Sequence, residues 1–79
     1  MLTAEQIRAA RALIRMDQAR LAKAADVSVE TIKRLEGLEG PLTSARAGTL
    51  DVIQRALEVA GVEFTNGDQP GVKMRKRKR

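Results

Sequence analysis

The side chains of this sequence that could do chemistry are mostly cationic, and they gather in two stretches. Residues 8–34 contain seven Lys or Arg against three Asp or Glu, and residues 73–79 contain six basic residues and no acidic one. Residues 35–72 carry two basic and six acidic residues. Each Lys or Arg that neutralises a phosphate releases a condensed counterion, so the two basic stretches favour a polyanion partner. A basic terminal run also occurs as a solvated tail that only aids solubility, and charge alone leaves both interpretations open.

Other chemistry is scarce among the 79 residues, which include no His and no Cys. Without Cys there is neither a disulfide nor a thiolate zinc site, and without His the commonest general base and metal ligand is missing. We therefore predict no enzyme, no metal and no cofactor. The apolar runs are only a few residues long, and Met1 is not followed by a charged segment and an apolar stretch. Neither a membrane span nor a signal peptide is expected.

The elements that position the basic residues are predicted to be helices. Strand-rich domains depend on β-branched and aromatic residues, and this short chain has a single aromatic residue. Apolar spacing and N-cap residues predict four helices: Ala4 to about Met16, Gln18 to Ala24 or Ala25, Val29 to Leu35 or Glu36, and from between Ala45 and Thr49 to Ala60. Gly37 and Gly61 are expected to end the last two, Gly37 as the glycine that follows a C-cap. The expected buried positions are Ile7, Ala10, Leu13, Ile14, Leu21, Ala22, Ala25, Ile32, Leu35, Leu50, Ile53, Ala56 and Leu57.

The C-terminal part changes to the two-residue alternation of a strand at Val62–Thr65. Asn66-Gly67 is a strong hairpin signal, and Val72–Met74 is expected to return as the partner strand. A lone hairpin is marginally stable, so we expect it to pack on the helices or to pair with a second subunit. The predicted fold is all-α in the main, a four-helix bundle with a small β-hairpin and a basic tail. We divide the chain into a helical domain (1–61), a hairpin (62–75) and a disordered basic tail (76–79).

Two short helices joined by a tight turn, residues 18–35, form the most informative arrangement in the chain. A helix-turn-helix unit needs a turn-tolerant residue, apolar residues that hold the pair together, and an exposed face on its second helix. The residues expected to hold the pair together are Leu21, Ala22, Val27, Ile32 and Leu35. The exposed face is left to Val29, Glu30, Lys33 and Arg34, with Thr31 near its edge.

Residues 17–37, DQARLAKAADVSVETIKRLEG, resemble the lambda-repressor/Cro-like helix-turn-helix proteins, also called the xenobiotic-response-element family. The shared pattern is a Gln opening the second helix, Leu-Ala within it, a small residue at the turn, an apolar-Ser pair, Thr-Ile, and a closing Glu followed by Gly. The resemblance extends over about Ile7 to Gly61. It implies a DNA-binding transcriptional regulator in bacterial or phage cytoplasm, at the nucleoid, acting as a homodimer on an inverted-repeat operator. The chain departs from the family at Asp26, where Gly is common, and in having a hairpin where many members have a fifth helix.

The resemblance also implies roles for individual residues. The base readers would be Val29, Glu30 and Arg34. Phosphate contacts would come from Ser28, and from Gln18 unless it binds an end of the recognition helix instead. Arg11 and Glu36 would form a structural ion pair. Charge and position add Thr31 and Lys33 as phosphate contacts, with Arg20 and Arg46 as weaker candidates. Glu30 is equally explained as a helix-dipole partner. For Lys33 the phosphate contact is preferred, and a solvated surface lysine is the alternative.

The basic run at the C-terminus supports a separate prediction. Flexible basic arms track a DNA backbone or enter an adjacent minor groove. The residues concerned are Lys73, Arg75, Lys76, Arg77, Lys78 and Arg79.

Two other functions remain open at this level. One is an antitoxin-like interaction module that holds a partner protein through the hairpin. The other is an architectural or recombination-associated DNA binder dominated by the basic tail. For a homodimer, the candidate interfaces are the fourth helix with its following strand, or pairing of strands 62–65 and 72–74. The operator sequence and the choice between activation and repression stay undetermined.

Overall fold

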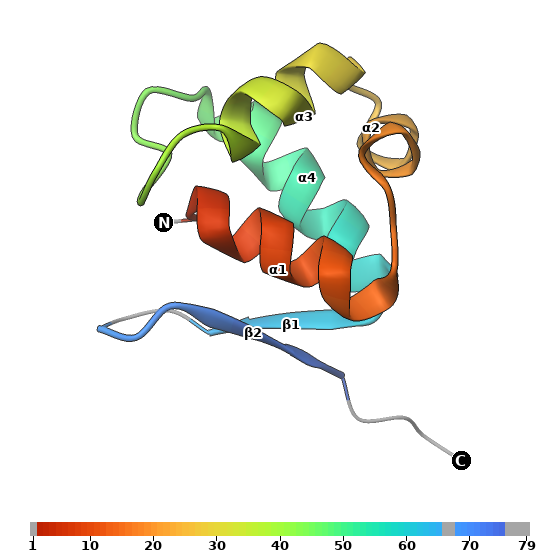
Figure 1. Cartoon of the computed structure of the whole chain (residues 1–79), viewed down its shortest axis with the longest axis vertical. Coiled ribbons are helices and arrows are strands. Elements are labelled where there is room, and N and C mark those ends of the chain that lie inside the picture. The colour runs from red at the N-terminus through yellow and green to blue at the C-terminus, as the bar shows by residue number, and fades with distance from the viewer. Residues whose placement is uncertain (1, 66–67, 76–79) are drawn as a thin grey trace.

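Four helices and one two-stranded antiparallel sheet make up the described part of the chain, residues 2–65 and 68–75 of a computed structural model. In chain order they are α1 (Ala4–Ile14), α2 (Gln18–Ala25), α3 (Val29–Glu36), α4 (Ala47–Val59), β1 (Val62–Thr65) and β2 (Gly71–Met74). Figure 1 shows α2 and α3 at one end of the molecule, the hairpin at the opposite end, and α1 and α4 between them. The predicted mainly helical domain with a C-terminal hairpin is confirmed. Among these residues, no helix has both the length and the apolar character that crossing a bilayer requires.

The first three helices begin where a side chain caps the backbone. Thr3 and Gln6 form the predicted capping box, with Thr3 Oγ1 accepting from the Gln6 N–H at 3.0 Å and Gln6 Oε1 accepting from the Thr3 N–H at 2.9 Å. Asp17 caps α2, and Ser28 caps α3. The N-cap of α4 is Arg46, which makes no side-chain capping bond. The start of this helix is predicted only within a window because Gly48 interrupts the helical pattern there.

Two non-glycine residues in the left-handed backbone region set the turns around α2. Arg15 (φ 54°) ends α1 at Ile14, so the prediction that this helix continues to Met16 is wrong by two residues. Asp26 (φ 58°) makes the turn between α2 and α3. Asp tolerates this conformation because its short polar side chain bonds locally. Asp26 was expected to lie where the chain turns, and its left-handed backbone agrees with that expectation.

Gly37 does not have the conformation predicted for it. Its φ of −80° is right-handed, and its N–H donates to the carbonyl oxygen of Lys33, so it closes α3 as an ordinary C-cap. The positive φ expected there occurs instead in the following loop at Gly40 (φ 69°), and after α4 at Gly61 (φ 112°). Among the described glycines, these two use a backbone region that L side chains rarely adopt.

The core forms where the apolar faces of all four helices meet. Its largest fully buried side chains are Ile7, Leu21, Ile32, Leu35, Leu42, Ile53, Leu57 and Val62. Leu13 was predicted to be buried but is 42% exposed, and Ala56 is only partly buried. Leu2 and Leu42 were not predicted to be buried. They join the core because the Leu42 N–H donates to the Leu2 carbonyl, which ties the loop after α3 to the start of α1.

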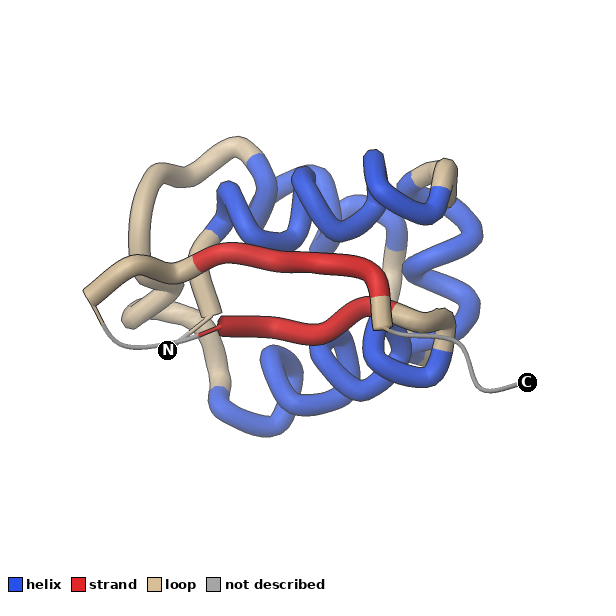
Figure 2. Tube along the Cα trace, turned by 90° about the horizontal axis from the view of Figure 1, so that it is seen from below, coloured by secondary structure: helices blue, strands red, loops and turns tan. Residues whose placement is uncertain are grey.

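The hairpin packs on the helices, as predicted for a sheet too small to be stable alone. Cross-strand partners lie on one face of an antiparallel pair, so Val62, Phe64 and Val72 share a face, and all three pack on the helical core. Figure 2, from below, shows both strands lying across the helices. β2 begins at Gly71, one residue earlier than expected, and the predicted Asn66-Gly67 turn lies outside the described residues.

Candidate nucleic-acid interface

The unit formed by α2 and α3 is held together by buried apolar side chains. Leu21 and Ala22 of α2 and Ile32 and Leu35 of α3 are all buried, at most 5% exposed. The turn between the helices is bonded internally, since the Val27 N–H donates to the Ala22 carbonyl at 3.0 Å. Residues 18–35 therefore form two short packed helices joined by a turn, with one face of α3 turned to solvent.

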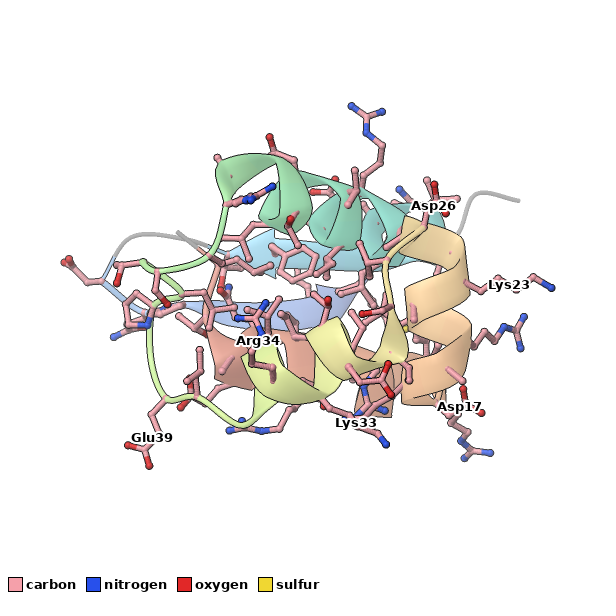
Figure 3. All side chains as sticks on the ribbon, turned by 90° about the horizontal axis from the view of Figure 1, so that it is seen from above. Asp17, Lys23, Asp26, Lys33, Arg34 and Glu39 are labelled. Atoms are coloured by element: carbon pink, nitrogen blue, oxygen red, sulfur yellow. The ribbon has the colours of Figure 1, made fainter. Side chains whose placement is uncertain are left out.

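The solvent face of α3 carries three charged side chains: Glu30, Lys33 and Arg34. Val29 and Thr31 are partly buried at its edges. Figure 3 looks onto this end of the molecule and shows Lys33 and Arg34 on α3, with Lys23 extending outward from the neighbouring α2. The face thus presents hydrogen-bond donors and acceptors on a helix of eight residues, about 12 Å long.

A groove of about 350 Å³ lies between α3, the loop that precedes α4, and the first turn of α4. Its lining residues are Thr31, Arg34, Ser44, Ala45, Arg46 and Thr49. Two guanidinium groups from different elements therefore border one polar hollow. The first turn of α4 contains no acidic residue, and its N-cap side chain makes no hydrogen bond, so its N–H groups add partial positive charge there.

The composition of this groove shows what sequence reasoning missed. Arg46 was ranked as a weak phosphate candidate, and Ser44 and Thr49 were not selected at all. All three lie beside Arg34 because the loop after α3 folds back toward that helix. No periodicity marks a loop residue as the neighbour of a helix, so the only signal was the three hydroxyl residues around the single arginine at 43–49.

Ser28 and Thr31 use their hydroxyl groups locally. Ser28 Oγ accepts from the Thr31 N–H at 3.1 Å and lies 2.8 Å from Thr31 Oγ1. The cap holds the first turn of α3 in place. Any phosphate contact by these two residues would use the remaining hydrogen-bonding capacity of their hydroxyl groups.

The ion pair between Arg11 and Glu36 is present and bidentate. Arg11 Nε donates to Glu36 Oε2 at 2.6 Å, and Arg11 Nη2 donates to Oε1 at 2.8 Å. Glu36 is only 5% exposed. Arg11 also donates to the Met16 carbonyl, and Arg8 to the Glu36 carbonyl. These bonds attach the C-terminal end of α3 to α1 and to the turn that follows α1.

Gln18, which is partly buried, joins this network. Its Nε2 donates to Glu36 Oε1 at 3.0 Å, which is the contact with the end of α3 that the resemblance offered as an alternative. Burial acts to raise the pKa of Glu36, but hydrogen bonds from Arg11 and Gln18 outweigh it and hold that pKa below its ordinary value. The same hydrogen bond raises the pKa of Arg11, because it stabilises the charged guanidinium. The carboxylate is therefore charged and fully paired.

The described part of the basic tail lies away from α3. Lys73 and Arg75 are exposed and belong to the hairpin end, which Figures 1 and 2 place across α1 and α4 from α2 and α3. Lys73 Nζ lies 3.6 Å from Glu63 Oε1 on the neighbouring strand. The remaining predicted tail residues, Lys76, Arg77, Lys78 and Arg79, lie outside the described residues.

Comparison with known proteins adds no relative to this geometry. No protein-family model matches the chain, and no curated protein matches it significantly. Any function therefore has to be argued from the residues themselves and from the surfaces that the fold presents.

Proposed function

We propose that the chain is a sequence-specific regulator that binds double-stranded DNA by placing α3 in the major groove. The observation that carries this proposal is the solvent face of α3, where Glu30, Lys33 and Arg34 project from a helix fixed at both ends. An α-helix with its side chains is about 10–12 Å across, which suits a major groove about 12 Å wide. Direct readout needs side chains held in register with base edges, and the network around Glu36 supplies that rigidity.

Each side chain on this face has a role that its chemistry suits. Arg34 pairs bidentately with guanine, and Val29 touches a thymine methyl group. Glu30 accepts from cytosine or steers Arg34, because a carboxylate at a phosphate would be repelled. Lys33 contacts phosphate.

The groove beside Arg34 supplies the backbone contact that sets the register. Arg46 and the start of α4 offer positive charge, while Ser44 and Thr49 offer hydroxyl donors. Phosphate contacts position a protein on the duplex without reading sequence. This groove therefore complements the reading face of α3.

The other two functions have less support. The apolar side of the hairpin packs on the chain's own helices, and Glu63 and Lys73 occupy its other face, so little apolar surface is offered to a partner protein. A DNA binder dominated by the basic tail would use the charge of the hairpin end, which lies at the opposite end of the molecule from the exposed face of α3.

The test is selection of bound duplexes from a random pool at about 150 mM salt, where non-specific phosphate binding is weakened. We expect an enriched sequence. Arg34→Ala should lose about 1–3 kcal/mol of discrimination at one base pair, because a bidentate contact is removed. Arg75→Ala is the matched control, since it removes one exposed arginine at the other end of the molecule.

Two outcomes would contradict the proposal. Binding without any enriched sequence would remove the regulator function. Equal losses from Arg34→Ala and Arg75→Ala would mean that charge, and not α3, governs binding.

A further inference from the structure

An acidic side chain on α1 holds the loop that leaves α3. The Glu5 carboxylate accepts from the Gly40 N–H through both of its oxygens, Oε1 at 3.0 Å and Oε2 at 3.2 Å. The carbonyl oxygen of the same glycine accepts from the Ala4 N–H at 3.1 Å. Figure 1 shows this loop running from α3 to the N-terminal end of α1. Both backbone polar groups of Gly40 are therefore bonded to the first turn of α1.

Arg8, one helical turn further along α1, holds the end of α3. Its Nη1 donates to the Glu36 carbonyl, and its Nη2 lies 3.8 Å from Glu5 Oε2. That carbonyl is one of those that a helix leaves unpaired at its C-terminal end, where a nearby cation is also favoured. Glu5 and Arg8 therefore bridge the two ends of residues 36–40. We call these two side chains the α1 clamp.

The segment inside the α1 clamp has little support from burial. Leu38 is 38% exposed, and Glu39 is exposed as well. The first side chain after α3 that enters the core is that of Leu42, which is 1% exposed. Where no side chain is buried, the position of the backbone depends on its hydrogen bonds. The bonds to Gly40 therefore decide how the loop leaves α3.

The α1 clamp connects both walls of the groove beside α3. Arg34 lies on the last turn of α3, and the end of that helix is held by Arg8. Ser44 and Arg46 belong to the loop that continues from Gly40. The spacing between Arg34 and Arg46 therefore depends on how the helix and the loop are each placed on α1. Groups that bind one ligand together must be held at the right spacing by the residues around them.

We infer that Glu5 is a positioning residue for DNA binding, which rests on the proposed function. By holding Gly40, it keeps Arg46 at the spacing from Arg34 that contact with the DNA backbone requires. Glu5 does not touch DNA in this role, and its negative charge repels a polyanion. Charge alone predicts that removing Glu5 strengthens DNA binding. Positioning predicts that its removal weakens binding, so the two explanations differ in sign.

The experiments use three variants that each raise the net charge of +5 by one. Glu5→Ala removes the acceptor of the Gly40 N–H, whereas Glu5→Gln keeps an amide oxygen that can still accept from it. Glu39→Ala is the matched control, because it removes an exposed carboxylate from the same loop. The Glu5 side chain is 53% exposed, so all three variants should keep the circular dichroism spectrum of the wild type.

Hydrogen exchange without DNA tests whether Glu5 orders the loop. In Glu5→Ala, the amides of Gly40, Leu42 and Ala45 should exchange faster than in the wild type, because their loop loses an anchor. Glu5→Gln should show a smaller change, and Glu39→Ala should show little. The amides of α2 should keep their protection in every variant. Unchanged exchange at Gly40 in Glu5→Ala would overturn the inference.

Affinity for DNA separates positioning from charge. The probes are a duplex recovered from the selection and a scrambled duplex of the same composition, both titrated at about 150 mM salt. We expect Glu5→Ala to bind both duplexes about threefold more weakly than the wild type, with Glu5→Gln between the two. Glu39→Ala should bind at least as tightly as the wild type. The loss should be equal on both duplexes, because phosphate contacts carry no sequence information.

A double-mutant cycle tests whether Glu5 acts through Arg46. Arg46→Ala alone should weaken binding, and adding Glu5→Ala should then cost little more, because no arginine is left to position. In Arg20→Ala, which removes an exposed arginine from α2, Glu5→Ala should keep its full effect. An equal loss in both backgrounds would mean that Glu5 has a general structural role, and this would contradict the inference.

The outcomes separate this inference from the proposed function. A wild type that selects a sequence, with a Glu5→Ala variant that binds as tightly as Glu39→Ala, would overturn the inference alone. A wild type that binds no duplex would overturn both. Weaker binding by Glu5→Ala, with faster exchange at Gly40 and no further loss beyond Arg46→Ala, would support the positioning role.

Discussion

The α3 end and the hairpin end of the molecule are each held against α1 by a buried polar side chain, but only at the α3 end is that side chain charged. Glu36 (5% exposed) is held by Arg11 and Gln18. Gln6 (3% exposed) donates from Nε2 to the carbonyl oxygens of Thr65 and Gly71, both at 3.0 Å. No buried side-chain nitrogen or oxygen among the described residues lacks a hydrogen-bond partner. Both anchors are therefore complete, although their chemistry differs.

This difference predicts how the two ends respond to mutation and to pH. An ion pair taken out of water depends on both partners, since removing one leaves the other as an uncompensated charge. A neutral amide that loses its partners leaves only unpaired polar groups, which is less severe. The α3 end should therefore be the more sensitive to mutation and the only one of the two anchors to respond to pH.

The largest effect is expected from Glu36→Gln. This change leaves Arg11 without its carboxylate, and the free energy of unfolding should fall by about 3 kcal/mol in urea titration. Glu39→Gln, which neutralises an exposed carboxylate in the following loop, should change it little. Replacing both partners, with Arg11→Met and Glu36→Met, should restore much of the loss. If Glu36→Gln lowers the free energy of unfolding no more than Glu39→Gln does, the ion pair between Arg11 and Glu36 does not stabilise the fold.

A smaller effect is expected from Gln6→Ala. The change removes the bonds to Thr65, Gly71 and the Thr3 N–H, at a cost of about 2 kcal/mol. Hydrogen exchange should become faster in β1 and β2, while the amides of α3 keep their protection. Glu36→Gln provides the comparison, because in that variant hydrogen exchange should become faster in α3 before it does in the strands. Equal acceleration at both ends in both variants would show that the two anchors form one cooperative unit.

The smallest effect is expected from pH. The folded-state pKa of Glu36 lies below its ordinary value near 4.5, while the unfolded chain titrates at that ordinary value. The contribution of the ion pair to stability is therefore fully present above that pH and is lost as the pH falls through the folded-state pKa. Between about pH 5 and pH 3, the free energy of unfolding should fall more steeply in the wild type than in Glu36→Gln. Parallel curves would mean that other carboxyl groups account for the acid response.

Much of the fold follows from bonds between residues that are close in sequence. The starts of α1, α2 and α3 come from Thr3, Asp17 and Ser28, each of which caps a backbone N–H three residues later. The predicted helices deviate by only one or two residues, most clearly at Arg15. Leu13 shows the limit of periodicity, because its spacing is that of a core residue but the residue is 42% exposed.

Other features depend on how the helices pack and have no local signal. The capping box identified Gln6 as a helix start, but not as the anchor of a hairpin 59 residues further along the chain. Arg34 and Arg46 share a groove because the loop between them folds back. Val52 and Val59 of α4 are exposed because Leu50, Ile53 and Leu57, on another side of that helix, fill the core. Caps and periodicity act over one or two helical turns, and local sequence is sufficient for them. Contacts between distant segments depend on which faces find partners, and only the packed chain decides that.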